Sequence, residues 1–97
     1  MSESTPNVVR NDAQNRFEIR EGDQIAQLAY DVSGGEIALV HTEVPPSLEG
    51  DGYGSALAKA ALDYARAQHL RVVPSCPFVA GYIRRHPEYA DLTKHQR

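Results

Sequence analysis

Three glycines at alternate positions, Gly50, Gly52 and Gly54, lie within residues 45–57 and give the clearest chemical signal of the sequence. Glycine adopts positive φ without strain and lets a ligand approach the backbone closely. An apolar stretch precedes the segment and a helical pattern follows it, so unpaired N–H groups and the positive end of a helix dipole would meet there. That combination favours binding of phosphate or pyrophosphate. The alternative is a turn in which glycine serves geometry alone.

The side chains of this loop are acidic, because Glu49 and Asp51 stand among its glycines. An anion would therefore be held by backbone amides and not by side-chain charge. The loop lacks the Gly-Lys-Ser/Thr sequence of a Walker phosphate loop. It also fits a Rossmann fingerprint badly, because three expected strands precede it and the chain is too short for a doubly wound sheet.

Cys76 and His41 are the candidate nucleophile and the candidate general base. Cys76 precedes Pro77 and an expected helix start, a position that lowers the pKa of a thiol and makes the thiolate a better nucleophile. Histidine is the residue type best suited to act as a general base near neutral pH, and His41 stands two residues from Glu43 on one expected strand. The alternatives are a small buried cysteine and a histidine that fills a core position.

Three strands are expected before the glycine loop. Residues 16–20 and 24–32 alternate polar and apolar side chains, and residues 36–44 form a less polar third strand. The short turns between these segments predict an antiparallel meander. In the third strand, a strict two-residue period places four side chains on one face. These are the side chains of Ile37, Leu39, His41 and Glu43.

A helix and a parallel strand are expected after the loop. From Tyr53 to Ala65 the apolar residues recur at the i, i+3, i+4 spacing of an amphipathic helix. The short apolar run of residues 70–73 then forms a strand parallel to the third, since a strand-helix-strand order implies a crossover. Pro77 begins a short C-terminal helix. The fold class is therefore α/β, of the mixed α+β kind.

The composition predicts one domain without a membrane span. The chain has 97 residues, which supports a single domain over residues 15–97 after a flexible arm of residues 1–14. Its net charge of −3 disfavours nucleic acid as a partner. The sequence shows neither a secretory signal nor an apolar run that would cross a bilayer, and its single cysteine fits a reducing, cytoplasmic setting. Neither His69 nor His95 has a partner at metal-ligand spacing, so we expect no metal site.

Residues 49–54, Glu-Gly-Asp-Gly-Tyr-Gly, resemble the acetyl-CoA-binding motif of the GCN5-related N-acetyltransferases, Q/R-x-x-G-x-G/A. Both motif glycines match, at Gly52 and Gly54, whereas Glu49 replaces Gln or Arg. The strand, loop, helix and strand around the motif stand in the order of that fold. Three further segments resemble a subfamily of small members, and the resemblance extends over residues 16–92. These segments are residues 41–45, 57–63 and 76–78.

The resemblance implies the cofactor and its site. The loop amides would hold the pyrophosphate of acetyl-CoA or coenzyme A, and Glu43 and Val44 at the end of the third strand would hydrogen-bond its pantetheine arm. Glu49 would bring a like charge near the phosphates and weaken cofactor affinity. A cysteine at the position of Cys76 is the proposed active-site residue of the subfamily. The cofactor-binding residues expected on this basis are Glu43, Val44, Glu49, Gly50, Asp51, Gly52, Tyr53, Gly54 and Ser55.

The activity that the resemblance implies is N-acetyl transfer from acetyl-CoA to an unidentified amine, on a small molecule or on a protein. Cys76 would form an acetyl-enzyme, or His41 would act as the base in direct transfer. The alternative is a non-catalytic module that binds coenzyme A and senses acyl state or docks a partner. The implied fold is GNAT-like, with an antiparallel meander, a strand-loop-helix-strand unit and a short C-terminal helix. We expect a monomer or weak homodimer that binds neither nucleic acid nor membrane.

Overall fold

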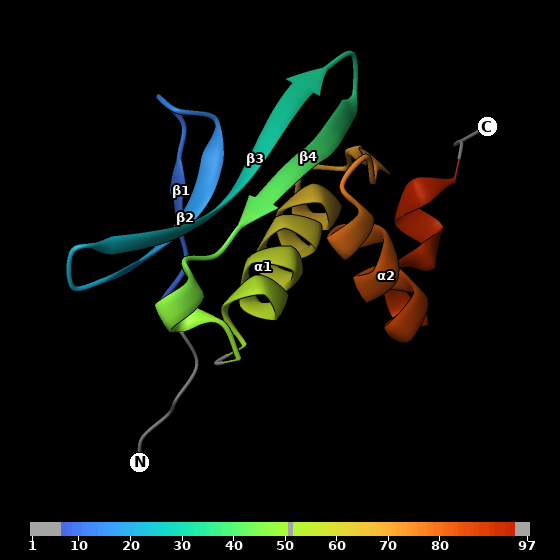
Figure 1. Cartoon of the computed structure of the whole chain (residues 1–97). Helices are drawn as coiled ribbons and strands as arrows, with labels where there is room; N and C mark the ends of the chain where they lie inside the picture. Colours follow the sequence, from blue (N-terminus) through green and yellow to red (C-terminus); the bar gives the residue numbers. More distant parts are fainter. Residues whose placement is uncertain (1–6, 51, 95–97) are drawn as a thin grey trace.

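Five strands form one sheet in the computed structural model, which describes residues 7–50 and 52–94 (Figure 1). Their order across the sheet is their order in the chain, and all neighbours are antiparallel except β4 and β5, which are parallel. The predicted meander and the predicted parallel pair are therefore confirmed. A short strand, β1, also forms within the segment expected to be an arm. The strands are β1 (Val9–Asn11), β2 (Arg16–Glu21), β3 (Gln24–Ser33), β4 (Glu36–Glu43) and β5 (Arg71–Val73).

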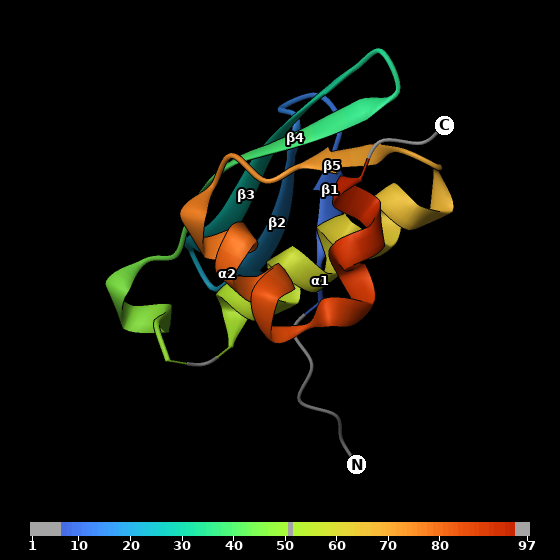
Figure 2. The same ribbon diagram turned by 90° about the vertical axis from the view of Figure 1, so that its right-hand side faces the viewer.

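Two α-helices of the described residues cover the same face of the sheet, as Figure 2 shows most clearly. α1 (Tyr53–Ala67) follows β4, and α2 (Pro77–Arg85) follows β5. Two 3-10 helices, Pro46–Leu48 and Pro87–Thr93, precede α1 and follow α2. In the described part of the chain the opposite face carries no helix, and we call it the open face. Within the described residues, no helix has the length and apolar character that a membrane span requires.

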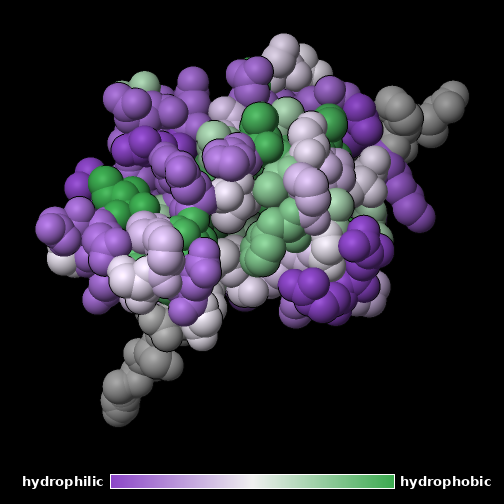
Figure 3. Space-filling view, viewed as in Figure 1, coloured by the Kyte–Doolittle hydropathy of each residue, from purple (hydrophilic) through white to green (hydrophobic). Residues whose placement is uncertain are grey.

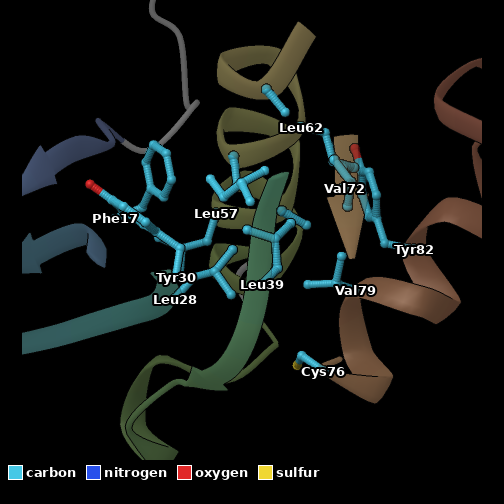
Figure 4. Close-up of a cluster of buried hydrophobic side chains, with 14 of the residues drawn as sticks. Phe17, Leu28, Tyr30, Leu39, Leu57, Leu62, Val72, Cys76, Val79 and Tyr82 are labelled. Atoms are coloured by element: carbon cyan, nitrogen blue, oxygen red, sulfur yellow. The ribbon is translucent and has the colours of Figure 1, made fainter. Parts of the chain in front are cut away.

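The helices pack on the sheet through one layer of apolar side chains (Figure 4). Three alanines of α1, Ala58, Ala61 and Ala65, are fully buried, and their small size lets the helix lie close to the strands. Each large side chain in this layer contributes about 1.5–3 kcal/mol by leaving water. The largest fully buried ones are Ile19, Leu28, Ile37, Leu39, Leu57, Leu62, Val72 and Val79. Figure 3 shows a mainly hydrophilic surface, with smaller apolar patches among the polar side chains.

β4 has one residue more than β3 in the middle of their ladder. Tyr30 of β3 pairs with Leu39, whereas the preceding Ala29 pairs with His41. Val40 is therefore an extra, bulged residue, and its side chain is exposed. Because side chains alternate along a strand, one extra residue reverses the face of every residue after it.

The bulge corrects the expected face of His41 and Glu43. Past it, Thr42 lies opposite the buried Leu28, and Glu43 lies opposite Gln27. Thr42 therefore faces the helices, while His41 and Glu43 are exposed on the open face. The expectation that they share a face with Ile37 and Leu39 is wrong, because a strict two-residue period holds only in a strand without a bulge.

Polar side chains connect four strands across the open face. Asn11 Nδ2 and Arg16 Nε donate hydrogen bonds to Glu18 Oε2, at 2.9 and 2.5 Å. Arg16 Nη1 donates to Gln27 Oε1 at 2.7 Å, and Gln27 Nε2 donates to Glu43 Oε1 at 2.9 Å. Glu18 is only 3% exposed. The hydrogen bond from Arg16, followed by the one from Asn11, holds the pKa of Glu18 below its ordinary value of 4.5.

We expect Glu18→Gln to lower the free energy of unfolding by about 1–3 kcal/mol at pH 7, because hydrogen bonds to a charged acceptor are lost. Since folding lowers the pKa of Glu18, its contribution is present above the ordinary pKa of 4.5 and is lost as the pH falls through the lower folded value. Urea unfolding at neutral and acidic pH measures this dependence. The control is Asp31→Asn at an exposed position of β3. Equal losses of stability in acid for wild type and Glu18→Gln would contradict the expectation.

Candidate functional site

An open cavity of about 380 Å³ lies between the end of β4, the loop that follows it and the starts of α1 and α2. We call it the glycine-loop cavity. Residues distant in sequence meet there because β4 and β5 are parallel neighbours, so the segments after both strands begin at the same edge of the sheet. The lining residues are Thr42, Val44, Leu48, Glu49, Gly50, Gly52, Tyr53, Gly54, Ser55 and Phe78.

Most of the residues predicted to bind a cofactor line this cavity, from Val44 through Ser55. Glu43 is not among the lining residues, because its side chain lies on the open face, and Asp51 lies outside the described residues. Thr42 and Phe78 line the cavity although neither was predicted to bind the cofactor. Tertiary contacts bring both to the site. The spacing of residue types does not single them out, although both fall within the segments 41–45 and 76–78 that resemble the small subfamily.

The backbone of the loop suits an anion. Gly50 and Gly52 have φ of 90° and 81°, a region that other residues enter only with strain. Gly52 ends the loop as the residue before α1, and its carbonyl accepts the first helical hydrogen bond, from Ala56. The N–H groups of Gly54 and Ser55 thus precede the first helical donor and have no acceptor within the helix. They line the cavity with the positive end of the helix dipole behind them.

Contacts at both ends hold the loop against the sheet. Leu48, in the 3-10 helix after β4, is buried with 7% of its surface exposed. The Tyr53 hydroxyl donates to Glu21 Oε1 at 2.9 Å, which ties the start of α1 to the end of β2. These contacts fix the loop before any ligand arrives, so less ordering is required on binding.

Gly54 allows α2 to approach α1. A Cβ at this position would lie 2.9 Å from Cζ of Phe78, closer than real Cβ contacts allow. The ring of Phe78 therefore lies directly on the first turn of α1 and forms one wall of the cavity. The third glycine of the loop thus has a packing role that its spacing alone did not reveal.

Cys76 lies where the two parallel strands separate. β4 and β5 pair only from Glu36 to Ala38, and the Cys76 N–H then donates to the Leu39 carbonyl at 2.9 Å. Cys76 is the residue before Pro77, which begins α2 as predicted. Figure 4 shows its side chain at this helix start, at the edge of the core.

The Cys76 thiol is buried beside Thr42. Its Sγ lies 3.2 Å from Thr42 Oγ1, and the residue is only 4% exposed. Burial is the largest influence on its pKa and raises it, but the Thr42 hydroxyl and the backbone N–H groups of Val79 and Phe78 together outweigh burial. The pKa of Cys76 therefore lies below its ordinary value of 9.0, although the residue makes no side-chain capping hydrogen bond at the helix start. A larger fraction of reactive thiolate follows.

The structure does not bring His41 to the thiol. Thr42 faces Cys76 on the helix side, whereas His41 lies opposite Ala29 on the open face, next to the network that ends at Glu43. A catalytic role for His41 stays a prediction. Among residues 7–50 and 52–94, no three His, Cys, Asp or Glu side chains cluster so that they could hold a metal ion.

Thr42→Val removes the hydroxyl beside Cys76 while keeping the branched side chain, so we expect it to raise the thiol pKa. Because only the thiolate reacts, the pH midpoint of alkylation by iodoacetamide should increase. Intact mass spectrometry follows the reaction without ambiguity, since the sequence has one cysteine. Thr42→Ser, which keeps the hydroxyl, should retain the wild-type midpoint. The same midpoint in Thr42→Val and wild type would show that the hydroxyl does not stabilise the thiolate.

Comparisons with known proteins match this architecture. The family model of the GCN5-related N-acetyl-transferases matches residues 16–92. Protein NATD1 of Homo sapiens is 38% identical over 63 residues, which cover 64% of this chain and 56% of that protein. Protein NATD1 of Danio rerio is 32% identical over 73 residues, which cover 72% of this chain and 66% of that protein. The chain thus spans between about half and two thirds of the curated relatives that it matches.

A solved structure has the same fold over nearly the whole chain. It is the NMR structure of a GCN5-like protein from Staphylococcus aureus, 28% identical, with a TM-score of 0.71 over 98% of this chain and 94% of that one. This likeness confirms the GNAT-like α/β fold expected from the sequence. Because the family model also covers most of the residues, from the start of β2 to the last 3-10 helix, the chain belongs to the GCN5-related N-acetyltransferase family.

Proposed function

We propose that the protein transfers an acetyl group from acetyl-CoA to an amine, and that Cys76 carries the group between them. The observation that best supports this is the position of the Cys76 thiol, which has a lowered pKa and lies directly behind a residue of the glycine-loop cavity, Thr42. Membership of the family supports acetyl-CoA as the donor, because its members generally use that cofactor.

The residues of the cavity fit coenzyme A in type and position. The amides of residues 52–55 would hold its pyrophosphate at the start of α1, whose first turn contains no acidic residue. The end of β4 at Val44 would meet the pantetheine arm. Glu49, exposed at the cavity, places a like charge near the phosphates and reduces affinity. Bound acetyl-CoA supplies the acetyl group as an activated thioester.

In the first step, the Cys76 thiolate attacks the acetyl carbonyl carbon and forms an S-acetyl bond. The bond between that carbon and the coenzyme A sulfur would break, and the sulfur would keep the electron pair and take a proton from solvent. In the second step, a neutral amine would attack the S-acetyl carbon and release one proton to solvent. The Cys76 thiolate leaves with its electron pair and is ready for another turnover, held by the hydroxyl of Thr42.

Direct transfer is the second route. His41 and Glu43, two residues apart in β4, are both exposed on the open face, and Gln27 donates a hydrogen bond to the Glu43 carboxylate. An amine that approached from this face would meet His41 as the base that removes its proton. This route forms no covalent enzyme intermediate. The two routes therefore differ in whether acetylated Cys76 can be observed.

A non-catalytic coenzyme A-binding module is the second candidate function. The observation that favours it is the burial of Cys76, which is 4% exposed and is not among the residues that line the cavity. Such a module would bind coenzyme A through the loop without consuming its thioester. A module of this kind needs no amine acceptor, because it transfers no acetyl group.

After incubation with acetyl-CoA, we expect the intact mass to increase by one acetyl group in the wild type and not in Cys76→Ala. Turnover with a panel of amines should fall at least a hundredfold in the variant, within the range known for loss of a nucleophile. Full turnover by Cys76→Ala would exclude the covalent route and leave direct transfer. Binding of coenzyme A without any thioester consumption would instead support the module.

Gly52→Ala should weaken coenzyme A binding about tenfold, because positive φ costs a residue with a Cβ roughly 1–2 kcal/mol and the loop relaxes away from its binding geometry. Gly35, in the turn between β3 and β4, has the same φ of 81° and is the matched control. Both alanine variants should lose similar stability, and only Gly52→Ala should lose affinity. Calorimetric titration with coenzyme A and thermal unfolding measure the two effects. If both variants bound coenzyme A with equal affinity, the glycine loop would not be part of the binding site.

A further inference from the structure

We propose that the ring of Phe78 sets the size of the acyl group that can pass from the glycine-loop cavity to Cys76, so that the protein selects acetyl over longer acyl groups. This inference rests on the proposed function and names a specificity-determining residue for it. Phe78 is the one residue of α2 that lines the cavity within the described part of the chain.

The ring of Phe78 is placed for contact with a ligand rather than for stability of the core. It is 39% exposed, whereas the other large apolar residues of α2 are buried. Those residues, Val79, Tyr82 and Ile83, hold the helix on the rest of the molecule. Loss of the Phe78 ring should therefore leave the fold intact.

The position of the ring is fixed by α1. Three of its atoms, Cζ, Cε2 and Cε1, lie 2.9, 3.2 and 3.5 Å from the point where a Cβ of Gly54 would be. Only a glycine at this position lets the ring lie so close to the first turn of α1. The ring thus forms a wall of the cavity against the first turn of α1.

The thiol lies outside the lining of the cavity. Cys76 stands two residues before Phe78 and is 4% exposed, and its Sγ contacts Thr42, which lines the cavity. The route to the sulfur that this proposal requires starts beside Thr42, in a cavity that the ring of Phe78 also lines. Acetyl ends in one methyl group, whereas butyryl adds two methylenes that would meet the ring. A single methylene changes discrimination by about 10–200-fold in an apolar site.

The first test compares acetyl-CoA, propionyl-CoA and butyryl-CoA as donors, with the rate of Cys76 acylation read by intact mass. We expect wild type to prefer acetyl over butyryl at least tenfold and Phe78→Ala to reduce this ratio at least tenfold. Val32→Ala, which truncates an exposed side chain at the far end of β3, should keep the wild-type ratio. The same ratio in wild type and Phe78→Ala would overturn the proposal.

A second readout is independent of acyl transfer. The single thiol is alkylated with iodoacetamide, which is small, and with N-phenylmaleimide, which is bulky. Phe78→Ala should accelerate the bulky reagent at least tenfold more than the small one. If the ratio of the two alkylation rates changes in Phe78→Ala while no variant consumes acetyl-CoA, the proposed function is wrong, but Phe78 does restrict access to Cys76. If acetyl transfer occurs but the ratio stays the same, Phe78 is not the wall and this inference fails.

The contact between Gly54 and Phe78 gives a third test. Gly54→Ala displaces the ring, so we expect it to change the ratio of the two alkylation rates. The change should disappear when Gly54→Ala is made in the Phe78→Ala background, because the displaced group is then absent. An equal change in both backgrounds would mean that Gly54→Ala acts through the loop, and would contradict the assigned role of the ring.

Discussion

One extra residue in β4 determines which side chains the candidate site contains. The bulge at Val40 turns Thr42 toward the helices and leaves His41 on the open face. Without it, Thr42 would point away from the core and Cys76 would have no hydroxyl beside its sulfur. The bulge falls just past the residues that pair with β5, so the same region of β4 also ends the parallel ladder and begins the separation of the strands. The cavity lies beside this separation.

At the glycine loop, side-chain charge opposes the binding of a phosphate group, whereas backbone geometry favours it. The protein has a net charge of −3, and Glu49 lines the cavity. Binding of a pyrophosphate would therefore depend on the dipole of α1 and on loop amides, and the conformations of Gly50 and Gly52 set the path of that loop. A net acidic chain disfavours nucleic acid but is compatible with a phosphate-bearing ligand for this reason. Such a site is sensitive to backbone changes more than to loss of single side-chain charges.

The spacing of apolar residues predicted the helices and strands well, but it could not predict contacts between segments that are distant in the sequence. The apolar spacing predicted a helix from Tyr53 to Ala65 and α1 runs to Ala67, since periodicity over four turns is a strong signal. The bulge could not be predicted, because Val40 is as apolar and β-branched as an ordinary strand residue. Likewise, the contacts of Thr42 with Cys76 and of Gly54 with Phe78 join segments that only the folded sheet brings together. Most residues expected from the sequence to bind the cofactor line the cavity, and their role in binding stays a prediction; Thr42 and Phe78, which also line it, were not among them.

The proposed acetyl transfer requires that coenzyme A lie against the start of α1, next to the Cys76 thiol. Titration of ¹⁵N-labelled protein with coenzyme A tests this directly, because each backbone amide reports its own surroundings. We expect the largest shifts on the amides of Gly52, Gly54 and Ser55, with smaller ones at Thr42 and Val44. No shift at millimolar coenzyme A, or shifts confined to the open face around Gln27 and Glu43, would contradict it.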